Sequence, residues 1–65
     1  MPNNTFDIVM TCEGVIDPVG DTDEERREHL VSCWQFLIDT GMAWRLQGWF
    51  GRTADALIEN GICTR

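Results

Sequence analysis

The residue pair with the clearest chemical potential is His29 and Cys33, which stand four positions apart. On a helix, residues four apart are neighbours on one face, so an imidazole could reach the thiol and act as its base. However, Cys33 lies among apolar residues, no third group in the sequence would orient the imidazole, and 65 residues leave little room for a pocket that excludes water. We therefore expect a packing role for this pair and no enzymatic activity.

The same two residues, with Cys12 and Cys63, supply the ligand types of a tetrahedral zinc site. The cysteines are 21 and 30 residues apart and form no CxxC pair, so the spacing has little specificity. An odd number of cysteines without close pairs is also not typical of a secreted disulfide framework. We expect reduced, mostly buried thiols, no bound metal and no cofactor.

Paired carboxylates are the other groups that could act as acid and base. Asp23 with Glu24, and Asp39 with Glu59, are examples. Negative charge in the first turn of a helix is favoured by the helix dipole, and solvated helix faces carry such residues without any catalytic role. We therefore predict no catalytic residue among them.

The elements that must position these groups are helical. Thr22 and Glu25 have the spacing of a capping box, which predicts a helix start, and the helix extends over 22–40. At 100° per residue, one arc of this helix is apolar. That arc contains Leu30, Val31, Cys33, Trp34, Leu37 and Ile38.

Two segments of matching residue classes, 37–42 and 57–62, indicate two helix ends. In each, a glycine (Gly41 or Gly61) follows the last polar pair and precedes an apolar residue. Glycine adopts the left-handed conformation at low cost, and this arrangement is the Schellman motif. We expect the apolar residue after each glycine to fold back onto the last turn.

The remaining segments complete the predicted fold. Asn4 or Thr5 can cap a first helix, residues 17–21 have turn chemistry, and Gly48 and Gly51 are expected to bracket a tight bend. The sequence thus predicts an all-α fold, in which one domain of residues 1–65 forms a compact small bundle. Its three main helices cover 5–13, 22–40 and 52–60, with a short helix at 42–47.

Charge limits the classes of partner. Eleven acidic residues face five arginines and no lysine, for a formal charge of −6. This balance disfavours nucleic acid and anionic lipid and favours a protein partner with a basic surface. A helix-turn-helix in which Arg52 and Asp55 read DNA is an alternative, but Asp55 and Glu59 make its reading helix acidic. No apolar run is long enough to span a membrane, and the start lacks the pattern of a signal peptide, so we expect a cytoplasmic product.

The segment 44–52 concentrates aromatic and arginine residues, which are the types enriched at interface hot spots. We expect Trp44 to lie in the core and Trp49 at the surface. The candidate partner-binding residues are Trp49, Phe50, Arg52 and Arg45.

The chain resembles a family of small uncharacterised proteins encoded by bacteriophages of actinobacteria. The similarity lies in the strings at 35–48, 51–54 and 56–62, and departs from the usual pattern at Met42 and Arg45. It implies a viral protein located in the host cytoplasm, and it transfers no catalytic residue.

These observations favour an interaction module that binds a host or phage protein. The alternatives are a self-associating structural or assembly component, such as a homodimer, because a core of this size is small, and, with less support, a DNA-binding regulator.

Overall fold

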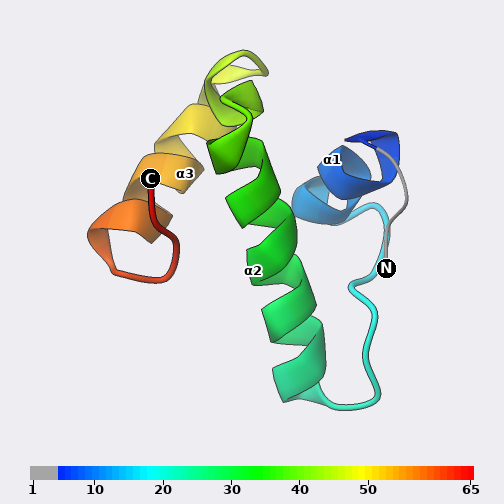
Figure 1. The fold of residues 1–65 in the computed structure, drawn as a ribbon. Coiled ribbons are helices and arrows are strands. Elements are labelled where there is room, and N and C mark those ends of the chain that lie inside the picture. The colour runs from blue at the N-terminus through cyan, green and yellow to red at the C-terminus, as the bar shows by residue number, and fades with distance from the viewer. Residues whose placement is uncertain (1–4) are drawn as a thin grey trace. The chain divides into compact units, whose positions relative to one another are not determined.

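The computed structural model describes residues 5–65, and every regular element in that range is helical (Figure 1). The expected all-α class is thereby confirmed. The elements are listed here in chain order: α1 (Thr5–Glu13), α2 (Asp23–Asp39), the 3₁₀ helix η1 (Met42–Trp44) and α3 (Gly48–Glu59). In this part of the chain no helix is long and apolar enough to cross a membrane. The chain divides into two compact units, one that ends at Cys33 and one that starts at Trp34.

The start of α2 is fixed by the capping box that the sequence predicts. The Glu25 backbone N–H donates to Thr22 Oγ1 at 3.1 Å. In return, Glu25 Oε1 accepts the backbone N–H groups of Thr22 at 3.2 Å and Asp21 at 3.0 Å. Backbone donors that the first helical turn leaves without carbonyl partners are thus satisfied by side chains.

Glycine in the left-handed conformation ends the helices, as expected. The three glycines are Gly14, Gly41 and Gly61, with φ of 84°, 78° and 74°. After α3, the Ile62 N–H donates to Leu57 O at 2.9 Å, which is the long hydrogen bond of a Schellman motif. After α1, the Val15 N–H donates to Met10 O at 3.0 Å in the same way. The predicted helix over 5–13 is therefore confirmed, while the proposed cap Asn4 lies outside the described residues.

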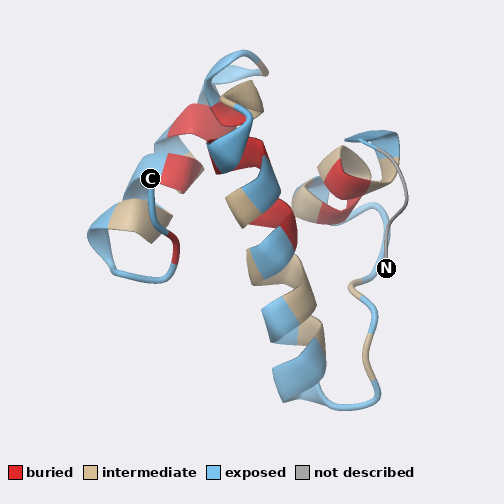
Figure 2. Cartoon of the chain, in the orientation of Figure 1, coloured by how far each residue is buried: buried red, intermediate tan, exposed pale blue. Residues whose placement is uncertain are grey.

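The unit that ends at Cys33 contains α1, the connector and the first part of α2. Among the described residues of this unit, the buried side chains are those of Ile8, Thr11 and Cys33 (Figure 2). Thr11 is the polar member, and its hydroxyl donates to the Asp7 carbonyl at 2.7 Å, so burial leaves it satisfied.

The unit that starts at Trp34 contains the end of α2, η1 and α3. Its core is formed by Trp34, Leu37, Ile38, Ala43, Phe50, Ala54 and Cys63. The segment after α3 is fixed by a two-way contact with α2: Gln35 Nε2 donates to Thr64 O at 2.6 Å, and the Thr64 N–H donates to Gln35 Oε1 at 2.9 Å. This contact holds the C-terminal segment against the end of α2.

The expected tight bend at Gly48 and Gly51 is wrong, because α3 already begins at Gly48 and not at residue 52. Glycine lowers helix propensity, which is why the segment resembled a bend. Here the missing side chain has a use: a Cβ on Gly51 would lie 3.1 Å from Cδ1 of Trp44. Close packing of η1 against α3 therefore favours glycine inside the helix.

The short helix expected at 42–47 is a single 3₁₀ turn, Met42–Trp44. The expected core position of Trp44 is also wrong, since its side chain is 39% exposed. The small Ala43, with no exposed surface, takes the buried position beside it. A turn of only three residues directs neighbouring side chains to different sides, so one of the two must face outward.

Candidate functional site

Three aromatic rings anchor α3 to the end of α2. The Trp34 and Trp49 rings meet edge to face with centroids 6.2 Å apart, Trp34 and Phe50 are 5.9 Å apart, and Trp49 stacks on Phe50 at 4.0 Å. Phe50 is 2% exposed and Trp49 is half-buried. Phe50 therefore contributes to the core and not to the surface of this unit, and Trp49 offers a partner only part of its ring.

Trp44 is the most exposed tryptophan, and three contacts hold its indole in place. Its Nε1–H donates to Asp55 Oδ1 at 3.2 Å. The Arg65 guanidinium lies over the ring, with Cζ 5.1 Å from the centroid, and also pairs with Asp55 at 3.5 Å. Because Gly51 has no side chain, the backbone of α3 can pack closely against the edge of the Trp44 indole. Stacked guanidinium and indole groups attract each other, so the ring is positioned although it faces solvent.

Two further arginines, Arg45 and Arg52, stand close to this contact along the chain. Arg45 follows Trp44 directly, and Arg52 follows Gly51, the residue against which Trp44 packs. Both side chains are exposed, and within residues 5–65 neither guanidinium makes a hydrogen bond or an ion pair. We call the set Trp44, Arg45, Arg52, Asp55 and Arg65 the Trp44 surface.

Of the residues selected from the sequence, Arg45 and Arg52 belong to the Trp44 surface, while Trp49 and Phe50 lie in the aromatic cluster. Trp44, Asp55 and Arg65 were not selected as partner-binding residues. Residues that stand far apart in the sequence give no local signal of this contact. Gly51 is the residue whose small size allows the contact, but the sequence pattern predicts it in a bend and not within a helix.

The His29 and Cys33 pair does meet, with Nε2 3.8 Å from Sγ. The other ring nitrogen, Nδ1, accepts the backbone N–H of Val19 at 2.8 Å. The neutral imidazole must then carry its proton on Nε2, facing the sulfur, and this tautomer cannot take a proton from the thiol. Burial raises the pKa of Cys33. Both effects keep Cys33 a protonated thiol, so the pair has a packing role.

Metal-ligand types do not converge in the described part of the chain, where no group of three or more His, Cys, Asp or Glu side chains could hold an ion. The thiol of Cys63 is buried in the unit that starts at Trp34, and burial followed by the nearby Asp39 charge raises its pKa. It is therefore neutral at ordinary pH.

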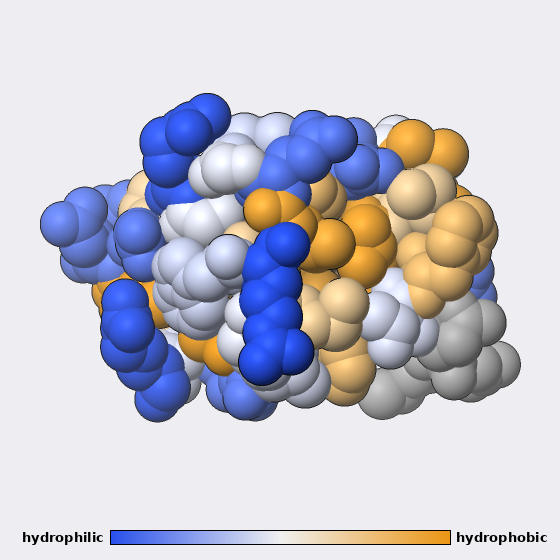
Figure 3. All heavy atoms as spheres, turned by 90° about the horizontal axis from the view of Figure 1, so that it is seen from above, coloured by the Kyte–Doolittle hydropathy of each residue, from blue (hydrophilic) through white to orange (hydrophobic). Residues whose placement is uncertain are grey.

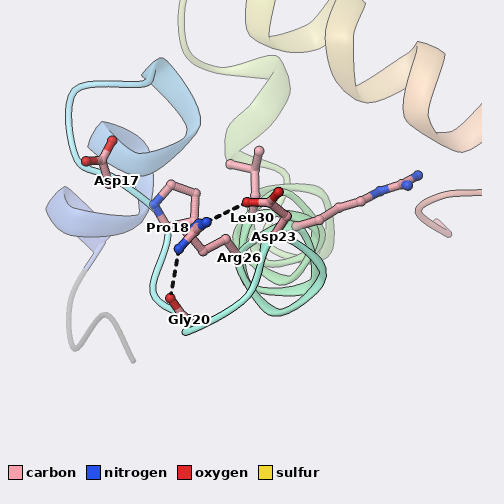
Figure 4. Close-up of a pocket in the computed structure, with 7 residues that line it drawn as sticks. Asp17, Pro18, Gly20, Asp23, Arg26 and Leu30 are labelled. Atoms are coloured by element: carbon pink, nitrogen blue, oxygen red, sulfur yellow. Dashed lines mark hydrogen bonds and ion pairs between the residues drawn. The ribbon is translucent and has the colours of Figure 1, made fainter.

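An open hollow of about 600 Å³ lies where the connector meets α2 (Figure 4). The Arg26 guanidinium donates to the Gly20 carbonyl at 3.2 Å and pairs with Asp23. These contacts engage Arg26 and support the connector, while Arg27, the other arginine of the lining, is exposed to solvent. We assign it no ligand.

Apolar side chains also reach the surface between strongly hydrophilic ones (Figure 3). In the unit that ends at Cys33, the exposed ones are Phe6 at 67%, Val15 at 69%, Ile16 at 37% and Val19 at 60%. Single exposed apolar residues are common, whereas several in one small unit are typical of proteins that associate.

No curated protein and no solved structure matches the chain. Residues 21–65 match the model of a family that is described as a domain of unknown function, and this match covers α2, η1 and α3 with their connections. Since it spans more than half of the sequence, the chain belongs to the family named domain of unknown function DUF7417.

Proposed function

We propose that this protein is a protein–protein interaction module, encoded by a bacteriophage and acting in the host cytoplasm, and that its partner contacts the Trp44 surface. The observation that supports the proposal is the exposed Trp44 indole, held by Asp55 and Arg65. Tryptophan and arginine are the residues most enriched at interface hot spots.

Positioning before binding matters for affinity. A side chain that is already fixed loses less conformational freedom when a partner binds, so more of the contact energy remains as affinity. Trp44 has its Nε1–H donor satisfied, a cation over one face and Gly51 against its edge. Trp49 and Phe50 support this arrangement by packing α3 against Trp34.

The experiment is affinity capture of the tagged protein from an actinobacterial host lysate, with Trp44→Ala beside it. Phe36→Ala is the matched control, because Phe36 is an aromatic residue of the same unit with a similar exposure, 36% against 39%. We expect one protein to be captured by the wild type and the control and lost with Trp44→Ala. If a folded Trp44→Ala variant retains every captured protein, the Trp44 surface is not the binding site.

Self-association is the second candidate function, supported by the exposed apolar residues Phe6, Val15, Ile16 and Val19. Its test is light scattering over a range of concentrations with Val15→Ser and Val19→Ser. A wild type that remains monomeric throughout rules it out, whereas a dimer that both substitutions weaken supports it.

A further inference from the structure

The net negative charge of the protein comes from one of its two units. Residues 1–33 account for the whole formal charge of −6, because residues 34–65 carry equal numbers of acidic and basic side chains. The latter are Asp39, Asp55 and Glu59 with Arg45, Arg52 and Arg65. The net charge of the chain is therefore a poor guide to what the Trp44 surface attracts.

Within that neutral unit, all three cations belong to the Trp44 surface. Arg65 is shared between the Trp44 ring and Asp55. Arg45 and Arg52 are exposed and make no ion pair or hydrogen bond in the described range, so their donors remain available. Arginine presents donors in a planar fork that matches a carboxylate with two parallel hydrogen bonds. Of the side-chain carboxylates in this unit, Asp55 is the one that contacts Trp44, and Trp44 and Arg65 already engage it.

We propose that the partner of the Trp44 surface is an acidic protein segment, in which an apolar side chain contacts the exposed face of Trp44 and flanking Asp or Glu carboxylates pair with Arg45 and Arg52. This inference rests on the proposed function and adds the chemistry of its partner. At physiological ionic strength, charges further away than about 8 Å are largely screened, so the arginines beside Trp44 act most strongly on a partner that contacts its ring.

Nucleic acid fits the same surface less well. Phosphate binding draws its affinity from several clustered cations and falls steeply with salt, whereas one of the three arginines here is already paired with a carboxylate. An acidic peptide needs only one or two charge-assisted contacts beside an aromatic anchor.

The test uses three probes on the ¹⁵N-labelled protein: a peptide of alternating Glu and Leu, the same peptide with Lys in place of Glu, and a single-stranded oligothymidylate. The readout is the indole N–H signal of Trp44, assigned with Trp44→Phe. We expect the acidic peptide alone to shift it, with affinity reduced about 3- to 10-fold by the Arg45→Gln, Arg52→Gln double variant. Arg27→Gln is the matched control, because it removes an exposed arginine from the other unit.

Each other outcome overturns the inference. Equal or tighter binding of the Lys peptide, preferential binding of the oligothymidylate, no shift with millimolar acidic peptide, or unchanged affinity of the double variant would each exclude an acidic partner. The capture experiment separates this failure from that of the proposed function. Suppose that a host protein is lost with Trp44→Ala but still captured by the double arginine variant. The proposed interaction module would then stand, and only the inference that its partner is acidic would be overturned.

Discussion

The Val19 backbone N–H donates a 2.8 Å hydrogen bond to Nδ1 of His29, ten residues further along the chain. This bond fastens the connector between α1 and α2 to the face of α2. It also sets the imidazole tautomer, and so directs the Nε2 proton to Cys33. In this tautomer His29 cannot act as a base toward the Cys33 thiol, and the contact between the two side chains is a structural one.

His29→Ala should release the connector. The variant loses one backbone-to-side-chain hydrogen bond, and we expect the free energy of unfolding to fall by about 0.5 to 1.5 kcal/mol. Urea denaturation measures this loss, and hydrogen exchange should show a faster Val19 amide. Glu28→Gln, an exposed neighbour on α2, is the control and should behave as wild type. Unchanged exchange at Val19 in His29→Ala would mean that the bond does not restrain the connector.

Gly61→Ala tests the helix stop. Gly61 has φ of 74°, and an alanine there would meet no neighbouring atom, so the cost is that of the backbone conformation alone. We expect a loss of about 1 to 2 kcal/mol in the free energy of unfolding. Gly61→Asn should lose less, because asparagine tolerates the left-handed region. Equal losses for the two variants, measured by urea denaturation, would contradict this explanation.

Alkaline pH should destabilise the fold through its buried thiols. Burial raises the pKa of Cys33 and Cys63 above the ordinary value of 9.0 in the folded state. Their contribution is therefore fully present below that value, and it is lost as pH rises through the folded pKa, because the unfolded chain releases these protons more easily. The sequence has neither lysine nor tyrosine, so few other groups titrate there.

The measurement is the melting temperature between pH 7 and about pH 10.5 under reducing conditions. We expect a plateau to about pH 8.5 and then a decline, which Cys63→Ala should make shallower. Cys63→Ser is a second variant of nearly the same volume, in case alanine leaves too large a cavity. A melting temperature that does not change across the range would show that the buried thiols do not contribute to the pH dependence.

The sequence predicted the features that depend on residues close together in the chain, and it missed those that depend on tertiary contacts. The Thr22 and Glu25 box and the glycine stops act within one helical turn, so their residue types and spacing were enough. The start of α3 depends on Gly51 packing against Trp44, and this tertiary contact reverses the usual meaning of glycine. For the same reason the Trp44 surface was found only in part: Arg45 and Arg52 share its segment, but Asp55 and Arg65 reach it through folding.

Gly51→Ala separates the two effects that meet at this glycine. In a helix interior the change should add up to about 1 kcal/mol of stability through propensity. The new methyl group, however, would lie 3.1 Å from Trp44 Cδ1 and 3.6 Å from the Ala43 carbonyl oxygen, so the indole must move. We expect overpacking to outweigh propensity, with a loss of about 1 kcal/mol and a shifted Trp44 indole N–H signal.

Ala56→Gly is the control for propensity alone, because Ala56 is exposed on the same helix. It should lose about 1 kcal/mol without moving the Trp44 signal. The matched pair therefore distinguishes a packing requirement from a backbone one. If Gly51→Ala is more stable than wild type and leaves the Trp44 signal in place, the close contact between η1 and α3 does not position the indole, and preorganisation of the Trp44 surface would have to come from Asp55 and Arg65 alone.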